Sequence, residues 1–193
     1  LRCATIGFRG RGNSHIGSIK GMQQREQGVK LTALCDVDKK VLEAGAAKHK
    51  VAGYQDIRVM LEKEELDVVT VATPNHWHSL AAIWAVQAGK DVYVEKPVSH
   101  NVWEGRQLVN AARKYKKIVQ TGTQARSSKC IQDAVQWVQA GNLGKIKVSR
   151  GLCYKRRGSI GDIPDTKDVP REVDYDLWLG PAPKKPLTRE RLH

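Results

Sequence analysis

Long apolar runs are missing from this 193-residue sequence. No stretch approaches the about 18 consecutive apolar residues that a membrane-spanning helix needs, so the sequence predicts no such helix. Internal repeats and low-complexity segments are missing too. Hydrophobic residues make up 40% of the chain and charged residues 27%, which are values typical of a globular protein. The length suits one full domain and part of a second.

Cysteine is scarce, and none of the four cysteines belongs to a C-x-x-C pair. Cys3 and Cys35 lie in expected core strands, where a buried free thiol is favoured over a disulfide or a zinc ligand. His76 and His78 are close in sequence, but no carboxylate or thiol stands nearby to complete a metal shell. We therefore predict no metal site.

Acidic residues are in deficit, with 20 Asp and Glu against 33 Lys and Arg, which gives a formal net charge of +13. Such a surplus is common in nucleic-acid-binding proteins. Here the cations are spread over the whole chain, and the densest run, residues 113–117, ends an expected helix, where positive charge suits the dipole. We interpret the surplus as solvated surface and predict neither nucleic acid nor a membrane as partner. The positive net charge also favours the approach of an anionic cofactor or an acidic sugar.

The chain starts at Leu1 rather than at methionine and enters an expected strand almost at once. We expect an N-terminal piece, such as a signal peptide, to be missing. Cytoplasmic and bacterial periplasmic locations both stay open.

A glycine-rich turn follows the first expected strand. Gly7, Gly10 and Gly12 have the spacing G-x-x-G-x-G, and a helix is expected to begin near Asn13 or Ser14, either of which is a suitable cap. Strand, glycine turn and helix form the arrangement that binds a dinucleotide diphosphate, because glycine lets the backbone approach the phosphates and the helix N-terminus attracts them. An ordinary glycine-rich turn is the alternative.

Asp36 ends the next apolar run, residues 31–35. A carboxylate at the end of the second strand accepts hydrogen bonds from the ribose hydroxyls of NAD and repels the 2′-phosphate of NADP. Asp36 comes somewhat later than the about 20 residues expected. A helix cap or turn is its alternative role, as we expect for Asp38. Together with the glycine turn, Asp36 predicts NAD as the cofactor, with NADP less favoured.

Strand and helix patterns alternate as far as residue 124. This alternation predicts an α/β fold, with a Rossmann-type doubly wound parallel sheet covered by helices. We place an NAD(P)-binding Rossmann domain at residues 1–124. Residues 125–193 are expected to hold a linking helix and the incomplete start of an α+β second domain for substrate binding and oligomerisation.

The predicted second part has two expected elements. A helix is predicted to start at residue 127 or 128 and to end at residue 140. Its expected core face consists of Ile131, Ala134, Val135 and Val138. Residues 145–154 alternate apolar and polar side chains, which predicts an antiparallel strand with one face open to water.

Polar side chains follow three of the expected strands, at residues 73–78, 95–97 and 120–126. Open α/β sheets bind ligands beyond the carboxyl ends of their strands. We therefore expect these segments to gather along one edge of the sheet, near the glycine turn.

Six segments together form a recognisable set: residues 7–12, 35–38, 72–78, 88–97, 120–126 and 178–183. With them, the sequence resembles the N-terminal part of the Gfo/Idh/MocA family of oxidoreductases, the group of glucose–fructose oxidoreductase and inositol dehydrogenase. The resemblance covers essentially the whole chain. Its most specific motif is the glutamate-lysine-proline at residues 95–97, where a Rossmann pattern precedes it.

The resemblance implies roles for these residues. Lys96 corresponds to the family's catalytic lysine, which exchanges or orients the proton of the substrate hydroxyl while a hydride passes to the nicotinamide. Lys96 and Arg126 would contact the substrate, and Glu95 and Pro97 would fix the backbone beside the lysine. The residues implied for cofactor binding are Gly7, Gly10, Arg11, Gly12, Asp36, Thr73, Pro74, Asn75, His78, Glu95 and Gln124.

Several of these residues have plainer alternatives. Glu95 suits a contact to the cofactor ribose and a purely structural acceptor equally well. His15 suits a place near the diphosphate and a cap of the first helical turn equally well. For Lys96 the alternative is a solvated lysine near a turn.

The activity implied by the resemblance is NAD-dependent oxidation of a CH–OH group in a sugar, polyol or glycoside, by a protein that is homo-oligomeric when full length. A glycoside hydrolase that uses a tightly held NAD for transient oxidation is one alternative, and a non-catalytic dinucleotide-binding module is another. Family members are longer than this chain and take a second catalytic residue from their C-terminal domain. An inactive fragment is therefore a further alternative.

Overall fold

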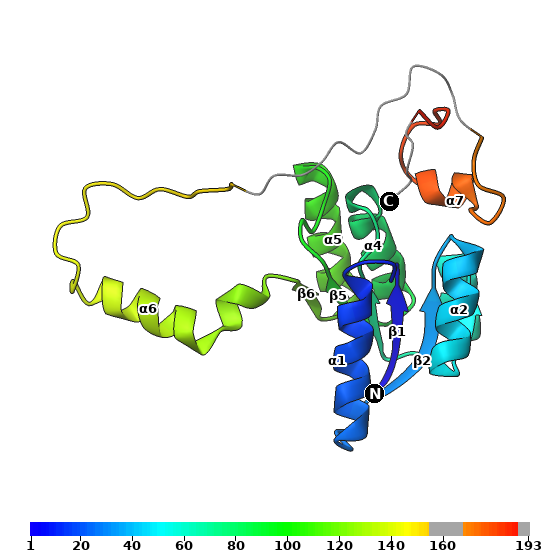
Figure 1. The fold of residues 1–193 in the computed structure, drawn as a ribbon, viewed down its shortest axis with the longest axis horizontal. Helices are drawn as coiled ribbons and strands as arrows, with labels where there is room; N and C mark the ends of the chain where they lie inside the picture. Colours follow the sequence, from blue (N-terminus) through cyan, green and yellow to red (C-terminus); the bar gives the residue numbers. More distant parts are fainter. Residues whose placement is uncertain (155–167, 189–193) are drawn as a thin grey trace. The chain divides into compact units, whose positions relative to one another are not determined.

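A computed structural model describes residues 1–154 and 168–188 (Figure 1). The remaining parts of the predicted second domain, residues 155–167 and 189–193, lie outside the described residues. Within the described ranges, no helix combines the length and the apolar character that crossing a membrane requires.

The chain divides into two compact units. The first comprises Leu1–Gly122 and Val169–Lys185, and the second comprises Thr123–Asp168 and Pro186–His193. The first unit therefore takes back a segment from beyond residue 124. Residues 169–185 are called the return segment below.

A six-stranded parallel sheet forms the centre of the first unit, in the order β3-β2-β1-β4-β5-β6. The strands are β1 (Arg2–Ile6), β2 (Lys30–Cys35), β3 (Ala52–Tyr54), β4 (Val68–Val71), β5 (Asp91–Val94) and β6 (Val119–Thr121). Strand order changes direction at β1, which lies between β2 and β4, so the crevice for a ligand is expected at the carboxyl ends of these strands. The predicted Rossmann-type fold is confirmed.

Helices cover both faces of this sheet (Figure 1). They are α1 (Gly12–Gln24), α2 (Lys39–His49), α3 (Ile57–Lys63), α4 (His78–Gln87) and α5 (Val102–Tyr115), with a short 3₁₀ turn η1 (Asn75–Trp77) before α4. Ile16 of α1 and Leu42 of α2 belong to one buried cluster. Met60 of α3 and Leu108 of α5 belong to another, which also includes buried residues of α4. Two separate cores, one from each group of helices, are what a doubly wound sheet requires.

Side-chain caps fix the starts of two helices, and the cap at Asp38 is expected from the sequence. The carboxylate of Asp38 accepts a hydrogen bond from the Val41 N–H (3.1 Å) and caps α2. The side-chain oxygen of Asn101 accepts from the Glu104 N–H (2.9 Å), and the Glu104 carboxylate accepts from the His100 N–H (3.2 Å). Both caps satisfy N–H groups that the first helical turn leaves without a partner.

The return segment packs onto two loops of the first unit. Val173 forms an antiparallel bridge with Asp38, at the start of α2. The indole N–H of Trp77 donates to a carbonyl oxygen of the short helix α7 (Tyr175–Leu179), at 2.9 Å. A Cβ at Gly180 would come within 2.2 Å of the Trp77 ring, so only glycine fits beside the indole. The segment thus contacts the loops that follow β2 and β4.

The helix expected near residues 127–140 is present as α6 (Lys129–Gln139), preceded by the 3₁₀ turn η2 (Gln124–Ser127), but its predicted core face is wrong. None of its residues is buried, and Ile131 and Val135 are 45% and 47% exposed. The pattern identifies an apolar stripe, also at Ala134 and Val138, but a stripe becomes a core only when another element covers it.

The predicted strand at residues 145–154 is also wrong, because the structure has no strand there. Ile146, Val148 and Tyr154 are largely exposed. A strand needs a neighbour to pair its N–H and C=O groups. The described residues of the second unit contain no such neighbour, and alternation alone cannot supply one.

The cysteines are free thiols, and Cys3 and Cys35 are buried as predicted. Burial raises the pKa of the Cys35 thiol well above its usual range, so the group behaves as a small apolar side chain. Among the described residues, no group of three or more His, Cys, Asp and Glu is arranged to hold a metal ion.

Candidate functional site

The glycine turn lies between β1 and α1, at the carboxyl edge of the sheet. Gly7 has φ +73°, and a Cβ there would come within 2.9 Å of the backbone of Thr73. A Cβ on Gly12 would lie 2.0 Å from the Gly7 carbonyl oxygen. A Cβ on Gly10 would meet nothing within 4 Å. Two of the glycines are therefore needed for the fold of the turn, and the third faces open space.

Helix α1 begins at Gly12, earlier than the expected start near Asn13 or Ser14, so neither residue is the cap. The residue in the cap position is Arg11, and its side chain makes no capping hydrogen bond. The positive end of the helix dipole lies at the glycine turn, because α1 begins there. This geometry suits an anionic group such as a diphosphate.

Asp36 joins the glycine turn to the loop between β2 and α2. Its carboxylate is 7% exposed and accepts hydrogen bonds from the N–H groups of Phe8 (3.2 Å) and Asp38 (3.1 Å). The carboxylate thus lies where the carboxyl ends of β1 and β2 meet. Its role as a ribose acceptor stays a prediction, which this position supports.

Glu95 is the buried acceptor of a small polar cluster. One of its carboxylate oxygens lies 3.0 Å from both Arg11 Nε and His15 Nε2. Burial raises the pKa of Glu95, but hydrogen bonds from His15 and Arg11 outweigh it, and the net pKa is lowered. Glu95 is therefore held as a carboxylate that ties α1 and the glycine turn to the end of β5. Of its two expected roles, the structural one has direct support in these contacts.

His15 makes contacts with β5 that the sequence does not predict, and its place near the diphosphate stays a prediction. Besides its contact with Glu95, the imidazole packs edge-on against the ring of Tyr93 on β5, with ring centroids 5.3 Å apart. Arg11 and His15 are four residues apart around the start of α1, which places them on one side of the helix. That spacing is the signal in the sequence that points to a shared partner.

The loop after β4 carries Thr73, Pro74 and Asn75, at the crevice side of Gly7. The side-chain oxygen of Thr73 is buried and has no hydrogen-bond partner within the described residues. Buried polar groups without partners are rare, so each one calls for an explanation such as a missing ligand. Together with the open space at Gly10, this oxygen fits a bound dinucleotide.

His78 is 2% exposed and ties two loops together. Its Nδ1 lies 2.6 Å from the Pro97 carbonyl oxygen and its Nε2 2.8 Å from the Thr73 carbonyl oxygen. The imidazole thus fixes the loop after β4 to the loop after β5. A direct contact of His78 with the cofactor stays a prediction, and its contacts show a supporting role under the loops.

Lys96 follows Glu95 at the end of β5, and its side chain is exposed. Its N–H lies 3.4 Å from the Glu95 carboxylate, and the Lys96–Pro97 peptide bond is cis. Gln124 and Arg126 lie in η2 of the second unit and are exposed. The approach of these two residues to the crevice stays a prediction.

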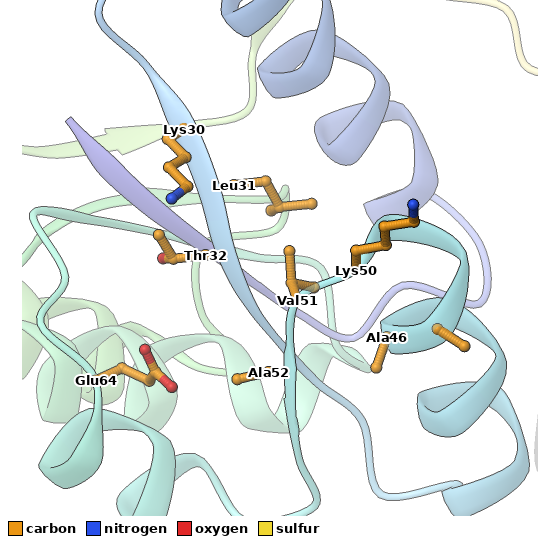
Figure 2. Close-up of a pocket in the computed structure, with 9 residues that line it drawn as sticks. Lys30, Leu31, Thr32, Ala46, Lys50, Val51, Ala52 and Glu64 are labelled. Carbon is orange, nitrogen blue, oxygen red and sulfur yellow. The ribbon is translucent and has the colours of Figure 1, made fainter.

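A cavity of about 600 Å³ lies at a different place on the sheet (Figure 2). Its lining includes Lys30 and Leu31 at the start of β2, Lys50 after α2, and Glu64 after α3. Asp36, by contrast, follows the opposite end of β2. This cavity is therefore separate from the glycine turn and does not form the candidate dinucleotide site.

These features define an NAD-binding Rossmann domain, and comparison with known proteins identifies its family. Residues 1–123 match the Gfo/Idh/MocA oxidoreductase family, NAD-binding Rossmann fold, and residues 110–193 match the C-terminal alpha/beta domain of the same oxidoreductase family. The chain belongs to the Gfo/Idh/MocA family of oxidoreductases, as the resemblance implies.

Individual relatives include dehydrogenases of known structure. Myo-inositol 2-dehydrogenase from Lactobacillus plantarum shares 28% identity with a TM-score of 0.66, covering 76% of this chain and 43% of that one. The WlbA dehydrogenase from Bordetella pertussis, crystallised with NADH and UDP-GlcNAcA, shares 26% identity with a TM-score of 0.69, covering 75% and 43%.

A curated relative carries a different name. The glycosyl hydrolase family 109 protein of Solibacter usitatus is 35% identical over 124 residues, which is 58% of this chain and 27% of that protein. The chain thus spans about a quarter of the length of this relative and less than half of the two dehydrogenases.

Proposed function

We propose that this chain is the cofactor-binding part of an NAD-dependent dehydrogenase that acts on a CH–OH group of a sugar, polyol or glycoside. The observation that carries the proposal is the contact of Arg11 with Glu95. It joins the glycine turn, where the diphosphate would rest, to the residue directly before Lys96. Cofactor turn and candidate proton acceptor are thereby held at one edge of the sheet.

Residues on both sides of the crevice have separate roles in this reaction. Bound NAD supplies the hydride acceptor. Lys96, exposed at the end of β5, takes the proton from the substrate hydroxyl as general base. Glu95 and His78 hold the backbone on either side of it. The open turn at Gly10 and the Thr73 hydroxyl line the cofactor side of the crevice.

The substrate class is supported by the relatives. One solved relative is an inositol dehydrogenase, and another was crystallised with NADH and a sugar nucleotide. Inositol and the sugar nucleotide are both rich in hydroxyl groups. We extend this class to the full-length form of the present protein, as a homo-oligomer, with the specific substrate left open.

A second candidate function is hydrolysis of a glycoside through transient oxidation, with no net consumption of NAD. The name of the curated relative, glycosyl hydrolase family 109 protein, favours it. The same cofactor turn and the same lysine serve both reactions, because both begin with removal of a hydride and a hydroxyl proton from the sugar.

One experiment separates the two reactions. The full-length protein is incubated with NAD and a panel of inositols, free sugars and chromogenic glycosides, and both NADH absorbance and released aglycone are followed. We expect NADH to accumulate in proportion to the substrate oxidised. Aglycone release without NADH accumulation would instead establish the hydrolase, and neither signal with any substrate would contradict both functions.

Cofactor preference tests the role of Asp36. We expect the chain to bind NAD at least about tenfold more tightly than NADP, because a buried carboxylate next to the ribose repels a 2′-phosphate. The replacement Asp36→Asn should weaken the binding of NAD and reduce the difference between the affinities for NAD and NADP. Glu43→Gln removes a carboxylate from the exposed face of α2 and serves as control. Calorimetry that gives equal affinity for both cofactors would remove Asp36 from this role.

A further inference from the structure

Arg9 occupies a position that is normally glycine in a dinucleotide-binding fingerprint. The pattern G-x-G-x-x-G, started at Gly7, places its third glycine at Gly12 and its second at position 9, where this chain has arginine. The second glycine normally lets the backbone come close to the diphosphate. Here a long cationic side chain leaves the turn at that point, and the open glycine, Gly10, comes one residue later.

The guanidinium of Arg9 reaches the loop after β2. Its Nη1 lies 3.1 Å from the carboxylate of Asp38, which is 7% exposed, whereas the Arg9 side chain is 53% exposed. The Asp38 N–H in turn donates to Asp36, whose other oxygen accepts from the Phe8 N–H. Arg9 therefore belongs to the same network as the carboxylate predicted to hold the adenosine ribose.

This arrangement places opposite charges at the ribose position. Asp36 repels a 2′-phosphate, whereas a half-exposed guanidinium attracts one and can bind it with two parallel N–H groups. Arg11 is turned to Glu95, and Lys39 is paired along its own helix with Glu43. Arg9 is thus the cation that the hydrogen bonds of Asp36 and Asp38 hold beside the predicted ribose position.

We propose that Arg9 is a second determinant of cofactor choice, which binds the 2′-phosphate of NADP and so lets the chain accept NADP alongside the preferred NAD. This inference rests on the proposed dinucleotide site and goes beyond it, because the fingerprint alone assigns no phosphate contact to the side chain at position 9. On binding NADP, the guanidinium shares its donors between Asp38 and the phosphate.

The test compares the dissociation constants of NAD and NADP for the purified 193-residue chain by calorimetry. For Arg9→Gly, which restores the glycine pattern, we expect NADP to bind about tenfold more weakly and NAD to change less than about threefold, since a charge-assisted contact is lost for NADP alone. Arg9→Lys keeps the charge without the two-pronged geometry and should fall between. Lys39→Ala removes an exposed cation from the first turn of α2, next to Asp38, and should leave the ratio of the two dissociation constants unchanged.

Different results identify different failures. A parallel loss of NAD and NADP affinity, or an unchanged ratio in a variant whose thermal unfolding is normal, overturns the role of Arg9 alone. The role of Arg9 is also overturned if Lys39→Ala shifts the ratio of the NAD and NADP dissociation constants as much as Arg9→Gly does. The loss of any nearby positive charge would then explain the effect. If Arg9→Gly does not fold, Arg9→Lys decides. A wild-type chain that binds neither cofactor overturns the proposed function together with this inference.

Discussion

Replacing Gly12 with alanine should abolish NAD binding and lower the stability of the first unit. The added methyl group would stand 2.0 Å from the Gly7 carbonyl oxygen, so the turn has to open. Overpacking of this kind costs about 1–3 kcal/mol. For a chain of this size that is a fall in Tm of roughly 3–10 °C. NAD affinity should fall at least about 100-fold, because two or more charge-assisted hydrogen bonds to the diphosphate are lost.

Two further glycine variants serve as controls. Gly17→Ala lies in the exposed part of α1, where a Cβ meets nothing within 4 Å, so stability should rise by about 0.5–1 kcal/mol with NAD affinity unchanged. Gly10→Ala also meets no protein atom, so it should keep its Tm but weaken NAD by narrowing the open side of the turn. Undiminished NAD affinity in Gly12→Ala would show that the cofactor does not rest on this turn.

The sheet and its helices were predictable because their signals are local. The apolar run in β4 reflects burial on both faces. Asp38 and Asn101 occupy cap positions that their neighbours in sequence define. The glycines of the turn follow equally local rules, since positive φ at Gly7 and the close approach at Gly12 exclude a side chain. Such features need no knowledge of distant residues.

Elements that depend on a distant partner were not predictable in the same way. The apolar stripe of α6 and the alternation at residues 145–154 are real patterns, but each requires another surface to become a core helix or a strand. The return segment shows the opposite case. Its few apolar residues give little periodic signal, yet Val173 and Leu179 are buried because they pack on the first unit.

The candidate site shows the same division. Its location follows from the rule that ligands bind beyond the carboxyl ends of parallel strands. The four-residue spacing of Arg11 and His15 predicts that they share one side of the helix, but no spacing rule identifies Glu95, at the end of the fifth strand, as their partner. Short-range patterns therefore identify the glycine turn and the motif at residues 95–97, whereas only the fold shows that Glu95 connects the two.

The second large effect is expected for Lys96→Ala in the full-length protein. Removal of a general base lowers turnover by a factor of about 10²–10⁴. NAD affinity should stay within about threefold of the wild type, because the exposed Lys96 side chain lies outside the contacts that shape the glycine turn. The split between turnover and cofactor affinity is what distinguishes a proton acceptor from a residue that supports the fold.

Lys90→Ala is the matched control for this variant. Lys90 directly precedes β5, whereas Lys96 follows it, so the two lysines flank opposite ends of one strand. Steady-state turnover, NAD calorimetry and thermal unfolding are measured for both variants. Because only the carboxyl end of β5 meets the glycine turn through Glu95, Lys90→Ala should keep wild-type turnover. Retained turnover in Lys96→Ala, or equal losses in both variants, would mean that the proton is taken by another group.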